Sequence, residues 1–326
     1  MTLEKKIIVK NLDQAERLDI FLSEKTKTSR SQIQKQIKDK QIFINNKAIK
    51  KTGAKVRNGD EITINKIKIQ KDTEKIETTP EKNNLKKIKI IKDGPDYIVL
   101  EKPSGILMHP TEAHEKNTLS DWLVKKYPQI KKVGDNPEQR PGIVHRLDKE
   151  ASGLIVVAKT QQMFEHLKKQ FQNREVEKIY SVLVFGNIDK DNTIIDFDID
   201  RGSDGKMVAR PKTDKMKLKN IKKIQTGKTA TTEIWKEKEY SRFTLLRVKI
   251  HTGRTHQIRV HMLAYGHPVV GDKLYYNKNL YKRNDILLDR LFLHAKKLCF
   301  TDLKNKQQSF EIDLPKKLKS YLENLK

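Results

Sequence analysis

The sequence predicts an α+β fold for a chain of 326 residues, in which a small N-terminal module precedes a larger mixed domain. Three observations support this prediction. Over residues 1–65, two short stretches of helical periodicity are followed by short alternating strands. Residues 66–87 are charged and, after Ile69, almost free of large apolar side chains, which is typical of a linker. Over residues 88–326, apolar runs of strand length alternate with amphipathic helical stretches.

The N-terminal module is expected to contain two helices, followed by strands with tight turns. In "AERLDIFLSEK" the apolar residues Leu18, Phe21 and Leu22 recur at helical spacing, and "SRSQIQKQIKDK" places Ile33 and Ile37 one turn apart. After these helices, "QIFINNKAI" predicts a hairpin around its two central asparagines, and "VRNGDEITI" predicts a turn before an alternating strand.

The larger domain is expected to begin with a strand in "YIVLEKPSG" and a helix that starts near Thr118 in "TLSDWLVKKY". The run "GLIVVAKT" predicts a strand buried on both faces, "QQMFEHLKKQFQN" a helix, and "KIYSVLVFG" another strand. Residues 200–228 are polar and rich in turn formers, which indicates a surface excursion. "FTLLRVKI" then predicts a strand, and "THQIRVHMLAYG" a helix that Gly266 and Pro268 would end.

The charge of the chain favours a polyanionic partner. Lysine and arginine number 69 against 42 aspartates and glutamates, which gives a formal net charge of +27. Nucleic acid is the leading partner, because neutralising backbone phosphates supplies affinity without any reading of bases. Plain decoration of solvated surfaces can account for part of this excess. No basic amphipathic helix with a broad apolar face is evident, so no membrane partner is expected.

The cysteine content and the N-terminus favour a cytoplasmic protein. The single cysteine, Cys299, excludes a disulfide within the chain and a zinc site built from thiolates, and it fits a reducing compartment. The first residues lack the apolar core of a signal peptide, and no apolar run reaches transmembrane length.

Few residues of the sequence could carry chemistry. His256 and His261, five positions apart with no acidic residue between them, make a poor metal site. A phosphate-binding glycine loop and a serine nucleophile elbow are both absent from the sequence. Asp148 remains, flanked by cations at a break between apolar arms, and a strand there would point Glu150 the other way. On chemistry alone, Asp148 is equally a salt-bridged structural residue or a nucleophile that a cation keeps ionised.

Four ordered stretches resemble the motifs of the RluA-type RNA pseudouridine synthases: "RPGIVHRLDKEASGLIVVAKT", "KIYSVLVFG", "HTGRTHQIRVHMLAYGHPVVGD" and "RLFLHAKKLCF". The first 65 residues resemble an RNA-binding module first described in a ribosomal small-subunit protein. Together the two resemblances imply an α/β RNA-binding module, a linker, and a catalytic domain over residues 88–326. That domain is expected to have a mixed, largely antiparallel sheet and a cleft.

The resemblance implies a catalytic role for three residues. The aspartate of the "HRLD" motif, here Asp148, is the nucleophile of the family, and it acts on the sugar, on the base or on a sugar proton. Tyr180 is expected to stack on the uracil and is a candidate for moving its proton. Arg259 is expected to pair with the aspartate and hold it ionised, and Arg254 is the alternative for this role.

The resemblance also implies residues that bind RNA. Arg146 matches a position that fills the gap left when the target base leaves its stack. Arg254 is expected to contact RNA beside it. In the N-terminal module, Arg30, Lys35 and Lys38 are expected to dock RNA, although the same three residues also fit a plain solvated helix face.

Other motif positions are expected to be structural. His145 and His294 are more readily explained by structural hydrogen bonds than by proton transfer, and Leu147 and Leu154 by the core. The stretch over residues 196–210 follows the family only loosely, so no substrate contacts are expected there from the resemblance.

The expected function is the isomerisation of specific uridines in RNA by a monomer that needs no cofactor and no metal. Large-subunit ribosomal RNA is the expected substrate, because family members with this N-terminal module usually act there. Transfer RNA is the alternative substrate. A non-catalytic ribosome-assembly protein is the rival function, and the presence of Asp148, Tyr180 and Arg259 argues against it.

Overall fold

The computed structural model describes residues 3–26, 33–34, 36–37, 41–49, 53–66, 82–111, 115–210, 227–282 and 288–325. The chain forms two compact units, Met1–Thr78 and Thr79–Lys326, and each is described by itself. The helix α3 (Lys82–Leu85) belongs to the second unit, where Leu85 packs against the main core, although it lies within the range 66–87 expected to be a linker. The bounds of that linker stay a prediction.

The first unit contains a four-stranded antiparallel sheet in the order β1 (Leu3–Ile8), β6 (Glu61–Lys66), β3 (Ile42–Ile44) and β4 (Lys47–Ala48). A two-stranded ladder joins β2 (Glu16–Arg17) to β5 (Lys55–Val56), and the expected helix α1 spans Leu18–Thr26. Leu18 and Leu22 share its core with Ile33 and Ile37, which lie in described helical residues.

The hairpin between β3 and β4 shows how the local sequence sets the local structure. Both turn residues, Asn45 and Asn46, have positive φ angles of 50° and 62°, the combination that a two-residue hairpin turn requires. Asparagine tolerates this region better than most residues do. The hairpin expected in "QIFINNKAI" is therefore confirmed.

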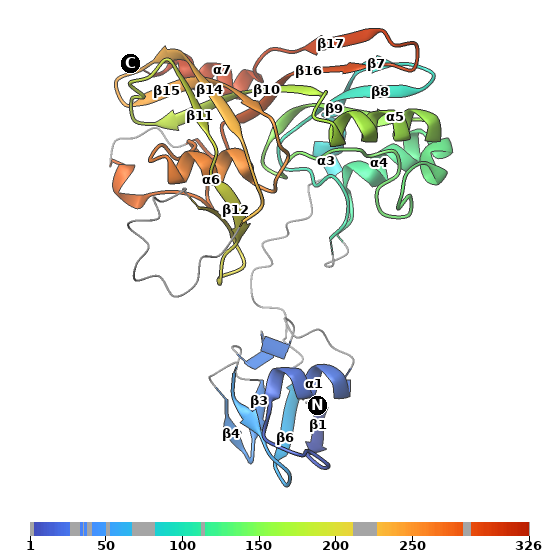
Figure 1. Ribbon diagram of the computed structural model, residues 1–326, viewed down its shortest axis with the longest axis vertical. Helices are drawn as coiled ribbons and strands as arrows, with labels where there is room; N and C mark the ends of the chain where they lie inside the picture. The colour runs from blue at the N-terminus through green and yellow to red at the C-terminus, as the bar shows by residue number, and fades with distance from the viewer. Residues whose placement is uncertain are drawn as a thin grey trace. The chain divides into compact units, whose positions relative to one another are not determined.

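The second unit is built on a nine-stranded sheet, drawn at the top of Figure 1. The strands are β7 (Lys89–Asp93), β8 (Tyr97–Lys102), β9 (Ser152–Ala158), β10 (Glu177–Phe185), β11 (Asn192–Ile195), β14 (Thr232–Glu239), β15 (Phe243–Ile250), β16 (Leu293–Thr301) and β17 (Gln307–Glu311). Their order is β11-β14-β15-β10-β16-β9-β8-β7, with β17 paired to β16. Only the β16–β9 pair is parallel, so the expected mixed, largely antiparallel α+β domain is confirmed.

Helices lie at both ends of this sheet. In Figure 1, α4 (Leu119–Lys126) and α5 (Gln161–Gln172) lie near β8 and β9, whereas α6 (Gln257–Ala264) lies at the other end, below β14. The hairpin of β12 (Asp198–Arg201) and β13 (Met207–Arg210) contacts α6. The remaining elements are the 3-10 helices η1 (Pro128–Lys132) and η3 (Lys278–Leu280) and the C-terminal helix α7 (Lys316–Glu323). Within the described residues, no helix combines the length and the apolar character needed to cross a membrane.

Local sequence signals explain where some of these elements begin and which of their residues are buried. Thr118 caps α4 through a capping box with Asp121, and Thr160 accepts a hydrogen bond from the backbone of Met163 at the start of α5. Every residue of β9 is buried, as its continuous apolar run predicts. The helix expected in "THQIRVHMLAYG" begins at Gln257, two residues later than that stretch, and ends before Gly266.

Candidate active site

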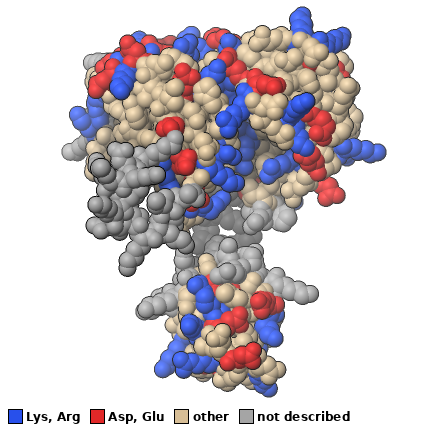
Figure 2. Space-filling model, in the orientation of Figure 1, with Lys and Arg blue, Asp and Glu red and all other residues tan. Residues whose placement is uncertain are grey.

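A cleft of about 480 Å³ opens in the second unit, where the segment before β9, the strand β10 and the segment before α6 meet. Five lysines and arginines line it, namely Arg140, Arg146, Lys168, Lys178 and Arg254. Asp148 is the one carboxylate among the lining residues. In Figure 2, lysine and arginine side chains gather along the hollow of this unit. The cleft is therefore suited to a polyanion that brings its reacting group to a single carboxylate.

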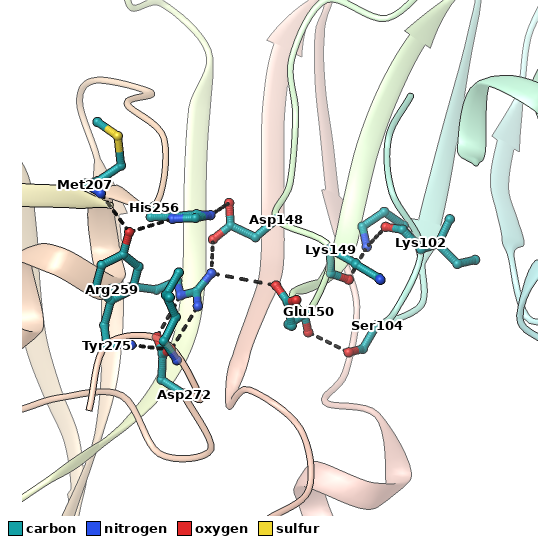
Figure 3. Close-up of polar contacts among 12 residues, drawn as sticks. Lys102, Ser104, Asp148, Lys149, Glu150, Met207, His256, Arg259, Asp272 and Tyr275 are labelled. Carbon is teal, nitrogen blue, oxygen red and sulfur yellow. Dashed lines mark hydrogen bonds and ion pairs between the residues drawn. The ribbon is translucent and has the colours of Figure 1, made fainter. Parts of the chain in front are cut away.

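Asp148 lies in the bend that leads into β9. The last residue of β8 and the turn after β8 form hydrogen bonds with that bend. The backbone oxygen of Lys149 accepts hydrogen bonds from the Gly105 amide at 2.7 Å and from Nζ of Lys102 at 3.2 Å. Ser104 Oγ donates to the backbone oxygen of Glu150 at 2.6 Å. These contacts, seen at the right of Figure 3, hold the backbone that directly follows Asp148 against the end of β8 and the turn after it.

Lys102 is fully buried below this bend. Its ammonium group also donates to the backbone oxygens of Pro103 and Ile106, at 3.0 and 2.9 Å. Burial lowers the pKa of Lys102 to about 7, although the charges of Asp148 and Glu150 act in the opposite direction. This lysine ties the turn after β8 to the segment that carries Asp148.

Close contact between two strands fixes where the Asp148 segment enters the sheet. Gly153 of β9 has a φ of 123°, and a Cβ atom there would lie 2.3 Å from the backbone oxygen of Ala295 in β16. Only glycine permits this approach. In the sheet, β16 lies between β9 and β10. The parallel pairing of β9 with β16 therefore brings Asp148, just before β9, close to β10.

Arg259, on α6, is 3% exposed and faces three carboxylates. Its Nε and Nη2 atoms donate to Asp272 at 2.7 and 2.8 Å, a bidentate pair that is buried on both sides. Its Nη1 atom donates to Oδ2 of Asp148 at 3.3 Å. The expected pairing of Arg259 with Asp148 is present in the structure, and Figure 3 shows both carboxylates around the guanidinium.

The expectation for Glu150 is wrong. Its Oε2 atom lies 3.7 Å from Nη1 of Arg259, so its side chain points to the same guanidinium as Asp148. The expectation misapplied strand alternation, since residues two apart on a strand share a face. These residues also precede β9 in a bend, where the Ala151 amide donates back to the oxygen of Asp148. Glu150 is half exposed, at 51% of its side-chain surface.

The carboxylates keep Arg259 charged. Burial alone would lower the pKa of Arg259, but hydrogen bonding and charge attraction to Asp272, together with the charges of Asp148 and Glu150, raise it above its ordinary value. A permanent positive charge therefore faces Asp148.

Tyr180 lies on β10, between Val248 of β15 and Ala295 of β16, next to a bulge in the pairing with β16. It is 5% exposed and lines the cleft. Burial, followed by the charge of Asp148, raises the pKa of Tyr180 above its ordinary value. Its phenol therefore stays protonated and presents an uncharged aromatic ring, which suits stacking.

The arginines expected to bind RNA take different places. Arg146 and Arg254 are both exposed and line the cleft. Nε of Arg254 donates to the backbone oxygen of Thr229 at 3.1 Å, and it is Arg259 that pairs with Asp148. Arg30, Lys35 and Lys38 of the N-terminal module lie outside the described residues.

The two motif histidines make hydrogen bonds that a structural role requires. Nε2 of His145 accepts the Val156 amide of β9 at 3.0 Å, and the ring stacks on Phe171 with centroids 4.7 Å apart. Nδ1 of His294 lies 2.9 Å from Oγ of Ser152. Leu147 and Leu154 are buried at 5% and 1% exposure, which agrees with a core role.

Three residues of the site are missing from the sequence-based prediction: Asp272, His256 and Tyr275. Asp272 ends the third motif stretch, "HPVVGD", and an acidic residue directly after a buried apolar run was the available signal. His256 lies in the third motif stretch but was considered only as a metal ligand, and Tyr275 gave no signal. The contact between them depends on a loop whose course the sequence does not reveal. In the part of the chain that the structure describes, no group of three or more His, Cys, Asp or Glu residues could hold a metal ion.

Two family models match this chain. A model described as RNA pseudouridylate synthase matches residues 96–264, which include Asp148, Tyr180 and Arg259. A model described as S4 domain matches residues 16–62, within the first unit.

Relatives with the same description extend over most of the chain. A protein of Aquifex aeolicus, named an uncharacterised RNA pseudouridine synthase, is 40% identical over 263 residues, covering 80% of this chain and 77% of its own length. A Borreliella burgdorferi protein named ribosomal large subunit pseudouridine synthase D is 33% identical over 316 residues, covering 96% of this chain and 90% of its own.

Two solved structures share the fold. Human RNA pseudouridylate synthase domain containing 1 superposes with a TM-score of 0.54 at 23% identity, covering 71% of this chain and 84% of its own. For human RNA pseudouridylate synthase domain containing 4, the TM-score is 0.56 at 22% identity, with coverage of 75% and 96%. At these identities the likeness concerns the fold alone.

Proposed function

This chain belongs to the RNA pseudouridine synthase family, and from that premise we propose that it isomerises specific uridines of large-subunit ribosomal RNA with Asp148 as its catalytic carboxylate. The observation that carries the proposal is the pairing of Asp148 with the buried, permanently charged Arg259 inside an otherwise cationic cleft. The name of the Borreliella burgdorferi relative supports the choice of ribosomal RNA. A monomer acting in the cytoplasm, where such RNA is found, is part of the same proposal.

The reaction needs no atom from outside the substrate. The bond between N1 of uracil and C1′ of ribose breaks, the base turns, and C5 bonds to C1′ while one proton leaves C5 and one is gained at N1. A carboxylate must therefore remain ionised beside the target nucleoside to act as nucleophile or base. Arg259 supplies the charge that favours this state of Asp148.

Tyr180 and the cleft arginines complete the proposed site. The ring of Tyr180 is proposed to stack on the uracil, since its phenol is uncharged and its position on β10 is fixed by two neighbouring strands. The target nucleotide must leave its stack to reach Asp148. The exposed Arg146 is proposed to fill the space that it leaves, and Arg254 to bind an adjacent phosphate.

The test compares two variants that each remove one carboxylate charge facing Arg259. Asp148→Asn should lower pseudouridine formation by at least about 10³-fold while folding and RNA binding persist. Glu150→Gln, at the exposed rim, should lower it by less than about tenfold. The measurement is chromatographic separation of the nucleosides from ribosomal and transfer RNA incubated with each protein, because pseudouridine and uridine have the same mass.

Each outcome distinguishes a different explanation. An active Asp148→Asn variant would show that another group does the chemistry. Equal loss in both variants would show that the net charge around Arg259 matters, and not the carboxylate at position 148. Product in transfer RNA alone would replace the proposed substrate, and wild-type protein that binds RNA without forming product would favour a ribosome-assembly role.

A further inference from the structure

His256 occupies a strained position between the reacting carboxylate and a buried tyrosine. It caps the N-terminus of α6 with φ 56° and ψ 22°, the left-handed region that few residues other than glycine adopt. Its Nδ1 atom lies 2.9 Å from Oη of Tyr275, and its Nε2 atom lies 3.9 Å from Oδ1 of Asp148. Figure 3 shows the imidazole spanning the space between these two partners. Backbone strain of this kind persists where the surroundings hold it in place.

The contacts of His256 favour one arrangement of its protons. The 3.9 Å between Nε2 and Oδ1 of Asp148 is longer than a hydrogen bond, but the carboxylate attracts an N–H at Nε2 and repels a bare nitrogen there. In a neutral imidazole, Nδ1 is then an acceptor, and the hydroxyl of Tyr275 donates to it. The oxygen of Tyr275 in turn accepts the backbone amide of Met207 at 3.1 Å. In this arrangement two hydrogen bonds lead from the amide of Met207 through Tyr275 to His256, whose Nε2–H points toward Asp148.

A neutral His256 agrees with its surroundings. Burial lowers its pKa, an effect that Arg259 strengthens and that the carboxylates of Asp148, Glu150 and Asp272 oppose. On the other side of the ring, Nδ1 faces the uncharged hydroxyl of Tyr275 and not a carboxylate.

Tyr275 is itself fixed by the partners of Asp148. It is 4% exposed, and its amide donates to Oδ1 of Asp272 at 2.9 Å. The guanidinium of Arg259 lies over its ring, 5.0 Å from the centroid. Arg259 thus contacts Oδ2 of Asp148 while His256 faces Oδ1, and both depend on the segment that begins at Asp272.

We propose that His256 is a positioning residue that sets the rotation of the Asp148 carboxylate, and that Tyr275 links this rotation to the hairpin β12–β13 through the amide of Met207. The inference rests on the proposed role of Asp148. Arg259 holds one oxygen, and a carboxylate held at one oxygen can still turn about its Cβ–Cγ bond. The Nε2–H of His256, 3.9 Å from the second oxygen, attracts that oxygen and favours one orientation of the carboxylate toward the nucleoside. A displacement of the hairpin would weaken this second contact.

His256→Asn provides the first test, because asparagine tolerates the left-handed backbone and its shorter amide still faces Tyr275 but does not reach Asp148. We expect an unchanged melting temperature, an unchanged Kd for RNA, and a single-turnover rate lower by about 10²-fold, the cost of a misplaced reacting group. An unchanged rate would overturn the proposal, and so would a loss of rate that comes only with weaker RNA binding or a lower melting temperature.

Tyr275→Phe tests the link to the hairpin. If Tyr275 acts through His256, the phenylalanine variant is slower than the wild type, and the double variant with His256→Asn is no slower than His256→Asn alone. Losses that multiply in the double variant would show that Tyr275 acts independently, and the proposed chain would be wrong.

The protonation of His256 gives a readout that needs no catalysis. In the full chain labelled with ¹⁵N histidine, the His256 ring, assigned by its absence from the His256→Asn spectrum, should be protonated at Nε2 and bare at Nδ1. Asp148→Asn and Tyr275→Phe should each shift its signals. The opposite tautomer, or signals insensitive to both variants, would overturn the proposal. A wild-type protein that shows the expected signals but forms no pseudouridine would instead contradict the proposed function.

Discussion

Arg259 carries one charge and faces three carboxylates, and the three contacts are unequal. Asp272 has no exposed side-chain surface and binds two of the guanidinium nitrogens, whereas Glu150 is half exposed and lies 3.7 Å away. Removing one member of a buried pair leaves an uncompensated charge. Asp272→Ala should therefore lower the free energy of unfolding by about 3–5 kcal/mol, while Glu150→Ala should change it by less than about 0.5 kcal/mol. Urea unfolding of both variants measures the difference, and similar losses would contradict this ranking.

Two neutral histidines make stability depend on pH. Burial lowers the pKa of His145 to about 3 and that of His294 to about 4, against about 6.5 in the unfolded chain. As the pH falls below about 6.5, the unfolded state binds protons that the folded state does not, so the free energy of unfolding falls. Each histidine contributes up to about 1.4 kcal/mol per pH unit. Urea unfolding at pH 7 and 5 should show a shallower decline for His145→Asn than for wild type; an unchanged decline would mean that His145 is protonated in the fold.

At the residue scale, sequence reasoning located the pair of Asp148 and Arg259 but not the residues that hold it. The pair lies in motifs that resemble a known family, so each partner could be predicted without knowing the path between them. Asp272 follows Arg259 by 13 residues across a loop, and no periodicity relates two positions separated in that way. Glu150 was misplaced because strand alternation separates neighbours and not residues two apart, so it gave no reason to point Glu150 away from Asp148.

At the scale of elements, the contact between β9 and β16 can be tested with two glycines of similar backbone. Gly153 has φ 123° and almost touches Ala295, whereas Gly205, in the turn after β12, has φ 81° and no atom within 4 Å of an added Cβ. Replacing either with alanine strains the backbone, but only Gly153→Ala also forces the two strands apart. We expect Gly205→Ala to cost about 1 kcal/mol and Gly153→Ala at least about 2 kcal/mol more, judged by thermal unfolding. Equal costs would show that the strands adjust freely.

The elements themselves were predictable, and their pairing was not. Continuous burial of β9 follows from an apolar run, and the starts of α4 and α5 follow from threonine caps. The parallel partner of β9 lies about 140 residues away, as the hydrogen bond between Ser152 and His294 shows with its separation of 142 residues. Local sequence carries no information about such a partner, so the sequence predicted no strand order, and the resemblance implied only a mixed, largely antiparallel sheet.

At the scale of the whole molecule, the net charge of +27 should appear as a salt dependence of RNA binding. The logarithm of the affinity should fall linearly with the logarithm of salt concentration, with a slope of about 0.7 for each phosphate contacted on a single strand. Arg254→Gln, in the cleft, should reduce that slope by about 0.7, because Arg254 is proposed to bind a phosphate. Lys317→Gln, on α7 and paired with Asp289, should leave it unchanged. Fluorescence anisotropy at several salt concentrations measures both slopes. A flat dependence for the wild type would mean that its basic charge is surface decoration.

The pairing of β9 with β16 also has a consequence in time. A chain is made from its N-terminus, so Asp148 is synthesised long before the strand that places it, and β16 ends at Thr301 in a chain of 326 residues. Arg259 and Asp272 are likewise made more than a hundred residues after Asp148. The cleft cannot be complete until β16 has been synthesised. A growing chain that still lacks its last strands, even while it is attached to a ribosome and close to ribosomal RNA, is not yet an enzyme.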